Sequence, residues 1–193
     1  MPDLALDGGD VVTTYLEMHA PDALRRSPVP DPAPLFLRAT EPLPELNRFL
    51  YTAVGGEWYW RDRLKWPYEK WVKWLDRPEL ETWLLYAGGT PAGYVELEKQ
   101  EGDDVEIAYF GLIPRFIGRG LGGHLLTLGI ERAWAMGAKR VWVHTCTLDG
   151  PAALANYQAR GMTIYDAETH QVPPLGPPDG PWPGARPAPA GAG

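Results

Sequence analysis

The sequence feature that most constrains the fold is a glycine-rich segment, Arg115 to Gly123, which separates a strand-like run from a helix-like run. The run before it, Val105 to Ile113, is rich in β-branched and aromatic residues, and Pro114 ends it because proline cannot extend a β-ladder. After the glycines, apolar residues recur at helical spacing from Leu121 to Met136, and Gly137 supplies a C-cap. The sequence therefore predicts a strand, a glycine-rich turn and a helix in that order.

A glycine-rich turn that opens a helix is suited to binding phosphate. Glycines allow successive backbone N–H groups to converge on one anion, and the helix N-terminus adds about half a positive charge beside them. Arg115 and Arg119 supply two cations in the same segment. A turn that binds no ligand is the alternative, but the strand, the glycines and the helix coincide at the spacing that a phosphate site needs.

Two common phosphate-binding patterns fit this segment less well. A P-loop needs a lysine after its glycines, and the sequence has none there. The dinucleotide-binding pattern G-x-G-x-x-G is matched literally by Gly118, Gly120 and Gly123, and Asp149 follows the next strand as the acidic residue. That fold needs further strand and helix pairs, however, and the chain after Asp149 is short and rich in proline.

The residues before the glycines argue against a fold in which a parallel sheet begins at this turn. Tyr94 to Gln100 and Val105 to Ile113 have the composition of strands, and the short polar segment Glu101 to Asp104 lies between them. Two strands joined by so short a segment form an antiparallel hairpin. The sequence therefore favours a third kind of phosphate-binding fold.

Two segments resemble motifs of the GNAT superfamily of N-acetyltransferases. The superfamily's cofactor loop has the pattern Q/R-x-x-G-x-G/A. Arg115 to Gly120 fits this pattern without a gap. Gly150 to Met162 resembles the helix motif N-P-A-A-x-x-x-Y-x-x-x-G-F, with Gly150 in place of the asparagine and Met162 in place of the phenylalanine. The resemblance covers Gly93 to Tyr165.

The resemblance implies an α/β protein with the GNAT fold, in which helices flank a central, mixed, mostly antiparallel and twisted sheet. We expect residues 1–171 to form one acetyltransferase domain. An extra N-terminal strand is predicted at Val11 to Met18. Other predicted elements are strands at Leu35 to Thr40, Arg140 to Cys146 and Met162 to Gln171, and a helix at Glu45 to Val54.

The C-terminal end departs from the superfamily pattern. Residues 172–193 are dominated by proline, glycine and alanine, and predict a poorly ordered tail that cannot supply a final strand. We hypothesise that Val11 to Met18 takes the place of that strand in the sheet. A homodimer formed through the tail is the alternative, with Trp182 as its one large anchor.

The resemblance implies acetyl-CoA as co-substrate, bound by the loop and by the strand before it. The pyrophosphate is expected on the backbone N–H groups of residues 117–122. The pantetheine arm is expected along the strand end at residues 111–113, where an amide at about Leu112 donates to the thioester carbonyl. The implied cofactor-binding residues are Leu112, Ile113, Arg115, Ile117, Gly118, Arg119, Gly120, Leu121, Gly122, Gly123 and Asn156.

The resemblance also suggests catalytic residues for transfer of an acetyl group to an amine. Tyr157 matches the tyrosine that gives a proton to the departing thiolate; a tyrosine packed on the sheet is the alternative. Glu106 stands eight residues before Pro114, where histone-acetylating members carry their catalytic glutamate, and is our first choice for the base. An exposed strand glutamate, with ordered water as the base, is the alternative. Glu96 and Glu98 share one strand face and are reserve candidates.

The resemblance implies that an aromatic cluster before the hairpin shapes the acceptor pocket. Trp58, Tyr59 and Trp60 are consecutive, so no regular element can bury all three. We hypothesise that Trp58 and Trp60 line a pocket for a hydrophobic or cationic amine, with Glu96 as a further substrate-binding residue. Trp71 and Trp74 suit one helical face and favour packing.

Composition excludes several other classes. The net charge of −7 argues against nonspecific nucleic-acid binding. The chain has one cysteine, which excludes an internal disulfide framework. No run approaches the ~18 apolar residues of a membrane span, and no basic-then-apolar leader opens the chain. His19, His124 and His170 show no metal spacing, and Cys146 suits a buried apolar site. His144 lies on the same strand face as Cys146 and could reach the cleft, but the favoured interpretation is a packed or partner-bonded histidine. A cytoplasmic enzyme without metal is expected.

The prediction is thus an N-acetyltransferase that moves acetyl from acetyl-CoA directly to a primary amine in a ternary complex, with a small molecule as the favoured acceptor. A noncatalytic acyl-CoA sensor is the first alternative. An acetyltransferase that acts on protein N-termini or lysines is the second.

Overall fold

The computed structural model describes residues 8–182, which build one seven-stranded sheet in the order β2-β3-β4-β5-β6-β1-β7. The strands are β1 (Gly9–Met18), β2 (Leu35–Ala39), β3 (Leu80–Ala87), β4 (Thr90–Lys99), β5 (Asp104–Leu112), β6 (Arg140–Cys146) and β7 (Thr163–Val172). The α-helices are α2 (Pro44–Gly55), α3 (Tyr68–Leu75), α4 (Leu121–Ala135) and α5 (Ala153–Ala159). Short 3-10 turns include η2 (Asp62–Lys65) and η4 (Pro114–Phe116).

The sheet is mixed and mostly antiparallel, which confirms the predicted fold class. Strands β2 to β5 pair as antiparallel neighbours, and β4 and β5 form the predicted hairpin. The pairing of β5 with β6 is parallel. The helix α4 lies between those two strands in the chain, as the crossover of a parallel connection requires.

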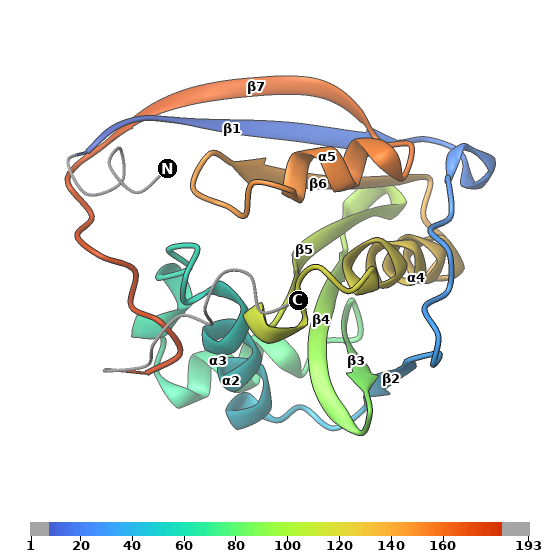
Figure 1. The fold of residues 1–193 in the computed structure, drawn as a ribbon, viewed down its shortest axis with the longest axis horizontal. Coiled ribbons are helices and arrows are strands. Elements are labelled where there is room, and N and C mark those ends of the chain that lie inside the picture. The colour runs from blue at the N-terminus through green and yellow to red at the C-terminus, as the bar shows by residue number, and fades with distance from the viewer. Residues whose placement is uncertain (1–7, 183–193) are drawn as a thin grey trace.

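The N-terminal strand lies inside the sheet, as we hypothesised. It pairs antiparallel with β6 from Thr13 to Met18, and with β7 from Gly9 to Glu17. Figure 1 shows β1 and β7 side by side along one edge of the molecule. A segment from the start of the chain therefore fills the position between β6 and the last strand.

Strands β5 and β6 pair over only three residues and then diverge. The pairing runs from Asp104 with Arg140 to Glu106 with Trp142. Just beyond this pairing, the register between β4 and β5 shifts by one residue: Leu97 is opposite Ile107, and the next residue of β4, Glu96, is opposite Tyr109. A bulge of this kind bends its strand and increases the local twist. The last residues of β5 are thereby left without a partner strand on the β6 side.

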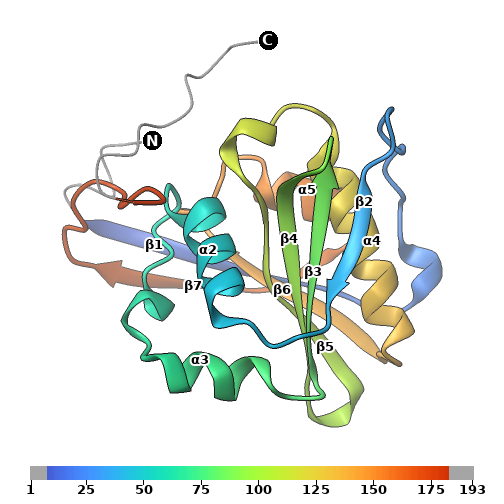
Figure 2. The ribbon, with the colours of Figure 1, turned by 90° about the horizontal axis from the view of Figure 1, so that it is seen from below.

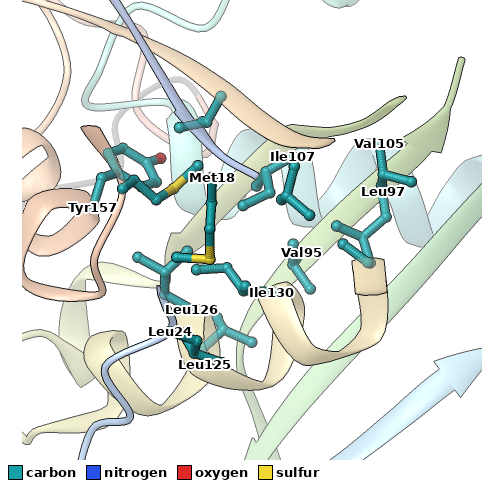
Figure 3. Packing of buried hydrophobic residues seen from close by; sticks show 14 of the residues in the cluster. Met18, Leu24, Val95, Leu97, Val105, Ile107, Leu125, Leu126, Ile130 and Tyr157 are labelled. Atoms are coloured by element: carbon teal, nitrogen blue, oxygen red, sulfur yellow. The ribbon is translucent and has the colours of Figure 1, made fainter. Parts of the chain in front are cut away.

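The larger part of the core lies between the sheet and α4. Leu125, Leu126 and Ile130 of α4 have no exposed surface and belong to one buried cluster with Val95 of β4 and Ile107 of β5; Figure 3 shows Ile130 beside Val95. Gly129 lets the helix come close, since a Cβ at that position would lie 3.2 Å from the Val95 side chain. Each fully buried side chain of this size contributes about 1.5–3 kcal/mol.

A smaller cluster covers the opposite face, beneath α2. Leu50 and Val54 of α2 pack with Leu84 of β3 and Tyr94 of β4. Figure 2 shows α2 and α3 on one side of the central strands and α4 on the other. Helices therefore cover both faces of the sheet where β4 and β5 run.

One strand is not predicted from the sequence. Residues 80–87, which form β3, read L-E-T-W-L-L-Y-A and are mostly buried on both faces. A short apolar run of this kind lacks the alternation of a half-buried strand and does not distinguish a strand from a buried helical turn. Pairing with β2 and β4 settles its conformation.

The described part of the C-terminal tail is attached to the domain. Val172 still belongs to β7, and residues 173–182 contain no helix or strand. The Arg61 guanidinium donates to the carbonyl oxygens of Leu175 (2.6 Å) and Pro177 (2.7 Å) and to the Asp179 carboxylate. Residues 173–182 therefore do not form the poorly ordered segment that we predict. The same prediction for residues 183–193 lies outside the described part of the chain.

None of the helices within residues 8–182 has the length and apolar character needed to cross a membrane.

Candidate active site

A cleft of about 980 Å³ lies where β5 and β6 diverge. Its walls come from five parts of the chain. These are residues 107–112 of β5, residues 143, 144 and 146 of β6, residues 148–157 around α5 except Leu154, the glycine-rich segment at residues 117, 118, 122 and 123, and residues 51, 54 and 58–62 on the α2 side. Thr13, Val172 and Leu175 complete the lining. The cleft is thus the direct result of the short β5–β6 pairing.

The glycine-rich segment forms an open backbone cradle at the start of α4. Gly118 and Gly120 have φ values of 83° and 74°, a left-handed conformation that favours glycine. A Cβ at either position would meet no atom within 4 Å. Within residues 8–182 no hydrogen-bond acceptor is found for the N–H groups of residues 118–122. These N–H groups are therefore free to bind an anion beside the helix N-terminus.

The Ile117 N–H group is not part of this cradle. It donates to the Pro114 carbonyl oxygen at 3.1 Å and closes the turn η4. The Ile117 side chain does line the cleft, with 52% of its surface exposed. The prediction that its amide binds the pyrophosphate is corrected, since the sequence pattern does not show which amides the preceding turn uses.

The predicted cofactor-binding residues divide into two groups. Leu112, Ile117, Gly118, Gly122, Gly123 and Asn156 line the cleft. Ile113, Arg115, Arg119, Gly120 and Leu121 do not belong to the lining residues. Leu121 is buried in the core, and the Arg119 guanidinium lies over the Phe116 ring at 5.3 Å. Arg115 and Arg119 are exposed.

Asn156 connects α5 to the start of α4. Its side-chain amide donates to the Gly122 carbonyl oxygen at 3.4 Å. A Cβ at Gly122 would lie 3.6 Å from the Leu112 side chain and 3.9 Å from the Asn156 amide. Strand β5, the loop and α5 therefore meet at this glycine.

Tyr157 lies in the cleft wall with 5% of its surface exposed. Its ring packs against Phe110 of β5, with 5.8 Å between ring centroids. Burial raises the pKa of the Tyr157 hydroxyl well above its usual range, and the nearby Asp149 carboxylate adds to this shift. The hydroxyl therefore stays protonated and remains a hydrogen-bond donor.

Asp149 holds the α2 side of the cleft against β6. Its carboxylate accepts hydrogen bonds from the Thr145 hydroxyl (2.8 Å), the Cys146 backbone N–H (2.9 Å) and the Trp60 indole N–H (3.3 Å). The sequence suggests this residue only as part of a dinucleotide-binding pattern. Its partners show a different role, which is to fix one wall of the cleft.

Glu106 does not reach the cleft, contrary to what we expect of a base. One carboxylate oxygen accepts a hydrogen bond from the Gln100 side-chain amide at 2.8 Å, and the other lies 3.2 Å from His144 Nδ1. His144 itself does line the cleft, with 49% of its side chain exposed. It is partner-bonded, as predicted, but it is also positioned at the site. The divergence of β6 from β5 produces this arrangement.

Glu96 is a structural residue rather than a wall of the cleft. It is 1% exposed, and its carboxylate binds Arg63 Nη1 (2.7 Å), the Trp74 indole N–H (2.9 Å) and the Asn47 amide (3.4 Å). The prediction that Glu96 contacts substrate or acts as the base is corrected. A period-two pattern shows which residues share a strand face, but not what covers that face.

Much of the aromatic cluster packs around Arg63. The Arg63 guanidinium lies 4.2 to 5.9 Å from the ring centroids of Trp66, Trp71, Trp74 and Tyr109. Trp71 is 2% exposed, in agreement with the predicted packing role. Arg63 and these four rings therefore build a buried cation–π cage that joins α3 to the sheet.

The remaining aromatic residues form one wall of the cleft. Trp58, Tyr59 and Trp60 all line it, in an irregular segment where Tyr59 has a φ of 62°. The rings of Tyr51, Trp60 and Tyr109 contact one another at centroid distances of 4.9 to 5.5 Å. Tyr51 and Tyr109 also line the cleft and are not predicted from the sequence. Asp62 adds a carboxylate to this wall.

No group of three His, Cys, Asp or Glu side chains with metal-binding geometry occurs in the part of the chain that the structure describes.

Solved structures of known proteins share this fold. A GCN5-related N-acetyltransferase from Kribbella flavida superposes with a TM-score of 0.61 at 17% identity, over 84% of this chain and 58% of that chain. An acetyltransferase of Bacillus subtilis, solved in complex with CoA, superposes with a TM-score of 0.52 at 24% identity, over 69% of this chain and 78% of that chain. At identities of 17% and 24%, this structural similarity shows that the chain shares the fold of these proteins, and it shows nothing about shared activities.

Sequence comparison identifies the family. A curated mycothiol acetyltransferase of Corynebacterium efficiens is 31% identical over 105 residues, which are 51% of this chain and 34% of that protein. The chain thus spans about a third of that relative. The model of the acetyltransferase (GNAT) family matches residues 45–162, which is more than half of the chain. The chain therefore belongs to the GNAT acetyltransferase family.

Proposed function

We propose that this protein transfers an acetyl group from acetyl-CoA directly to the primary amine of a small molecule. Acetyltransferases of this family use acetyl-CoA. The observation that carries the proposal is the cradle of free N–H groups at residues 118–122, which opens into the cleft between β5 and β6. An anion-binding cradle next to a deep cleft suits a ligand with a pyrophosphate at one end and a long arm at the other.

The residues present fit acetyl-CoA. The cradle and the N-terminus of α4 would bind the pyrophosphate, with no side chain in the way at Gly118 or Gly120. Leu112, at the end of β5, lies beyond the last pairing with β6, and its backbone groups, which point away from β4, would be available to the amides of the pantetheine arm. Phe110 and Tyr157 would flank the thioester end.

Two groups of the chain would assist the transfer itself. The acetyl-CoA thioester supplies the acetyl group, and an amine attacks it without an acyl-enzyme. A backbone amide at about Leu112 would donate to the carbonyl oxygen, where negative charge develops. The Tyr157 hydroxyl, which burial keeps protonated, would donate to the departing sulfur.

The acceptor side of the cleft favours a cationic amine. Its wall contains the indole rings of Trp58 and Trp60, which attract cations, and the Asp62 carboxylate. Val172 and Leu175 line the cleft as well, and Arg61 holds this part of the tail beside it. The tail and the tryptophans narrow this side, which favours a small molecule over a peptide. The cytoplasmic location and the homodimer stay predictions.

The proposal is tested by following release of free CoA thiol from acetyl-CoA with tryptamine, phenethylamine, spermidine and lysine-containing peptides as acceptors. We expect release that depends on at least one small amine, with the acetylated amine as product by mass spectrometry. Turnover of peptides alone would move the function to a protein acetyltransferase. Tight binding of acetyl-CoA without turnover of any acceptor would favour the noncatalytic sensor.

A further inference from the structure

We propose that His144 is the base that takes the proton from the amine, and that Glu106 acts behind it as a positioning residue. This inference rests on the proposed function. It differs from the prediction from sequence, in which Glu106 contacts the amine itself. The pair places a titratable side chain in the cleft and its carboxylate partner outside it.

The geometry of the two strands produces this pair. Glu106 is opposite Trp142 at the last parallel pairing of β5 with β6. His144 follows Trp142 by two residues, so its side chain lies on the same face of β6 but beyond the point of divergence. His144 Nδ1 lies 3.2 Å from Glu106 Oε1, and the imidazole lines the cleft that Glu106 does not reach.

A chain of hydrogen bonds determines which imidazole nitrogen is the base. The Trp142 indole N–H, which can only donate, binds Gln100 Oε1 at 3.0 Å. The Gln100 amide nitrogen must therefore donate to Glu106 Oε2, at 2.8 Å. The carboxylate then serves as an acceptor, and His144 Nδ1 carries the proton that faces it. In the neutral imidazole, Nε2 is left with the lone pair.

The charges around His144 make it more basic than an ordinary histidine. The Glu106 carboxylate on β5 is the main cause that raises the pKa of His144; burial opposes the shift, and Asp149 after β6 supports it. The other titratable groups near it are Tyr15 of β1, whose ring is 6.1 Å away, and Cys146 of β6. No cation from these elements faces the imidazole within the described residues.

The proton balance of the transfer is complete with these groups. The ammonium form of the substrate gives one proton to His144 Nε2, and the freed lone pair forms the C–N bond to the acetyl carbon. The C–S bond breaks, and the second proton of the nitrogen passes to the thiolate with the help of the Tyr157 hydroxyl. His144 then returns its proton to solvent, so that the products are the amide, CoA thiol and one proton.

The test compares the wild-type protein with three variants, His144→Gln, Glu106→Gln and the control His170→Gln. His170 Nε2 lies 3.3 Å from Glu168 on β7; both side chains are about half exposed and neither lines the cleft, so the control removes a similar pair outside the cleft lining. The readouts are imidazole titration by NMR, kcat and KM for phenethylamine or whichever small amine is turned over, and the thermal shift with desulfo-CoA.

We expect the pKa of His144 in the wild-type protein to lie above the ordinary 6.5 of a histidine and to fall in Glu106→Gln. His144→Gln should lower kcat by about 10²-fold or more, with the KM of the amine and the desulfo-CoA shift little changed. Glu106→Gln should move the acid limb of the rate profile to lower pH, and His170→Gln should change neither rate nor profile.

Two results would overturn the inference and leave the proposed function standing. One is a wild-type rate in His144→Gln, and the other is an acid limb that does not move in Glu106→Gln. A wild-type protein that binds desulfo-CoA but turns over no amine would contradict the proposed function, and the inference with it.

Discussion

Replacing Arg63 by methionine is expected to lower the free energy of unfolding by about 3–5 kcal/mol, because it leaves the Glu96 carboxylate buried without its cation. Arg63 is 4% exposed and Glu96 is 1% exposed, and the Arg63 Nη1 to Glu96 Oε1 distance is 2.7 Å. The same change removes the cation from the ring faces of Trp66, Trp74 and Tyr109. Urea unfolding of the full-length protein measures the effect.

A matched control and a double variant separate the ion pair from general packing. Arg26 and Glu131 form an exposed ion pair, and Arg26→Met should change the stability by about 1 kcal/mol or less. In the double variant Arg63→Met with Glu96→Leu no buried charge is left, so part of the loss should be recovered. A loss in Arg63→Met no larger than in Arg26→Met would contradict a structural role for this pair.

Tyr157→Phe is expected to lower kcat by about 10²–10⁴-fold, because it removes one hydroxyl that would donate to the departing sulfur. The ring should remain packed against Phe110, since the change adds no atoms and burial of the ring is almost complete. Binding of desulfo-CoA should therefore stay close to that of the wild-type protein. Steady-state kinetics and calorimetric titration measure the two quantities.

The control for this prediction is Tyr68→Phe. Tyr68 is 56% exposed at the start of α3 and does not line the cleft, so the same chemical change there should have no effect on kcat. A rate in Tyr157→Phe close to that of Tyr68→Phe would assign Tyr157 to packing, which is the alternative that its sequence position leaves open.

The elements around the cleft were predictable because their signals are local. Glycines, a proline and helical spacing delimit β5, the loop and α4 within about two residues of their observed ends. The strand β3 could not be predicted in this way, because its run of apolar residues shows no alternation. Its conformation depends on two partner strands, which are distant in sequence or separated by a turn.

The positions of the acidic residues were the least predictable part of the site. Glu96, Glu98 and Glu106 are strand residues with similar sequence surroundings, yet Glu96 is buried by Arg63 and Glu106 lies behind His144. Both outcomes depend on nonlocal features. The first is the turn η2, which contains Arg63, and the second is the divergence of β6 from β5 beyond Glu106.

The binding of acetyl-CoA by the cradle is the central claim, and thermal shift tests it most directly. The wild-type protein, Gly118→Ala and the control Gly89→Ala are each measured with acetyl-CoA, desulfo-CoA and NAD. Gly89 lies in the β3–β4 turn with a φ of 77°, close to the 83° of Gly118, and a Cβ at either position meets open space. Both variants should therefore bear a similar strain of about 1–2 kcal/mol.

We predict that both CoA ligands raise the Tm of the wild-type protein by several degrees, since ligand at a hundred times its Kd adds about 2.7 kcal/mol. Gly89→Ala should keep this shift, Gly118→Ala should lose most of it, and NAD should produce none. A shift with NAD alone, or an equal CoA shift in Gly118→Ala and Gly89→Ala, would contradict the account.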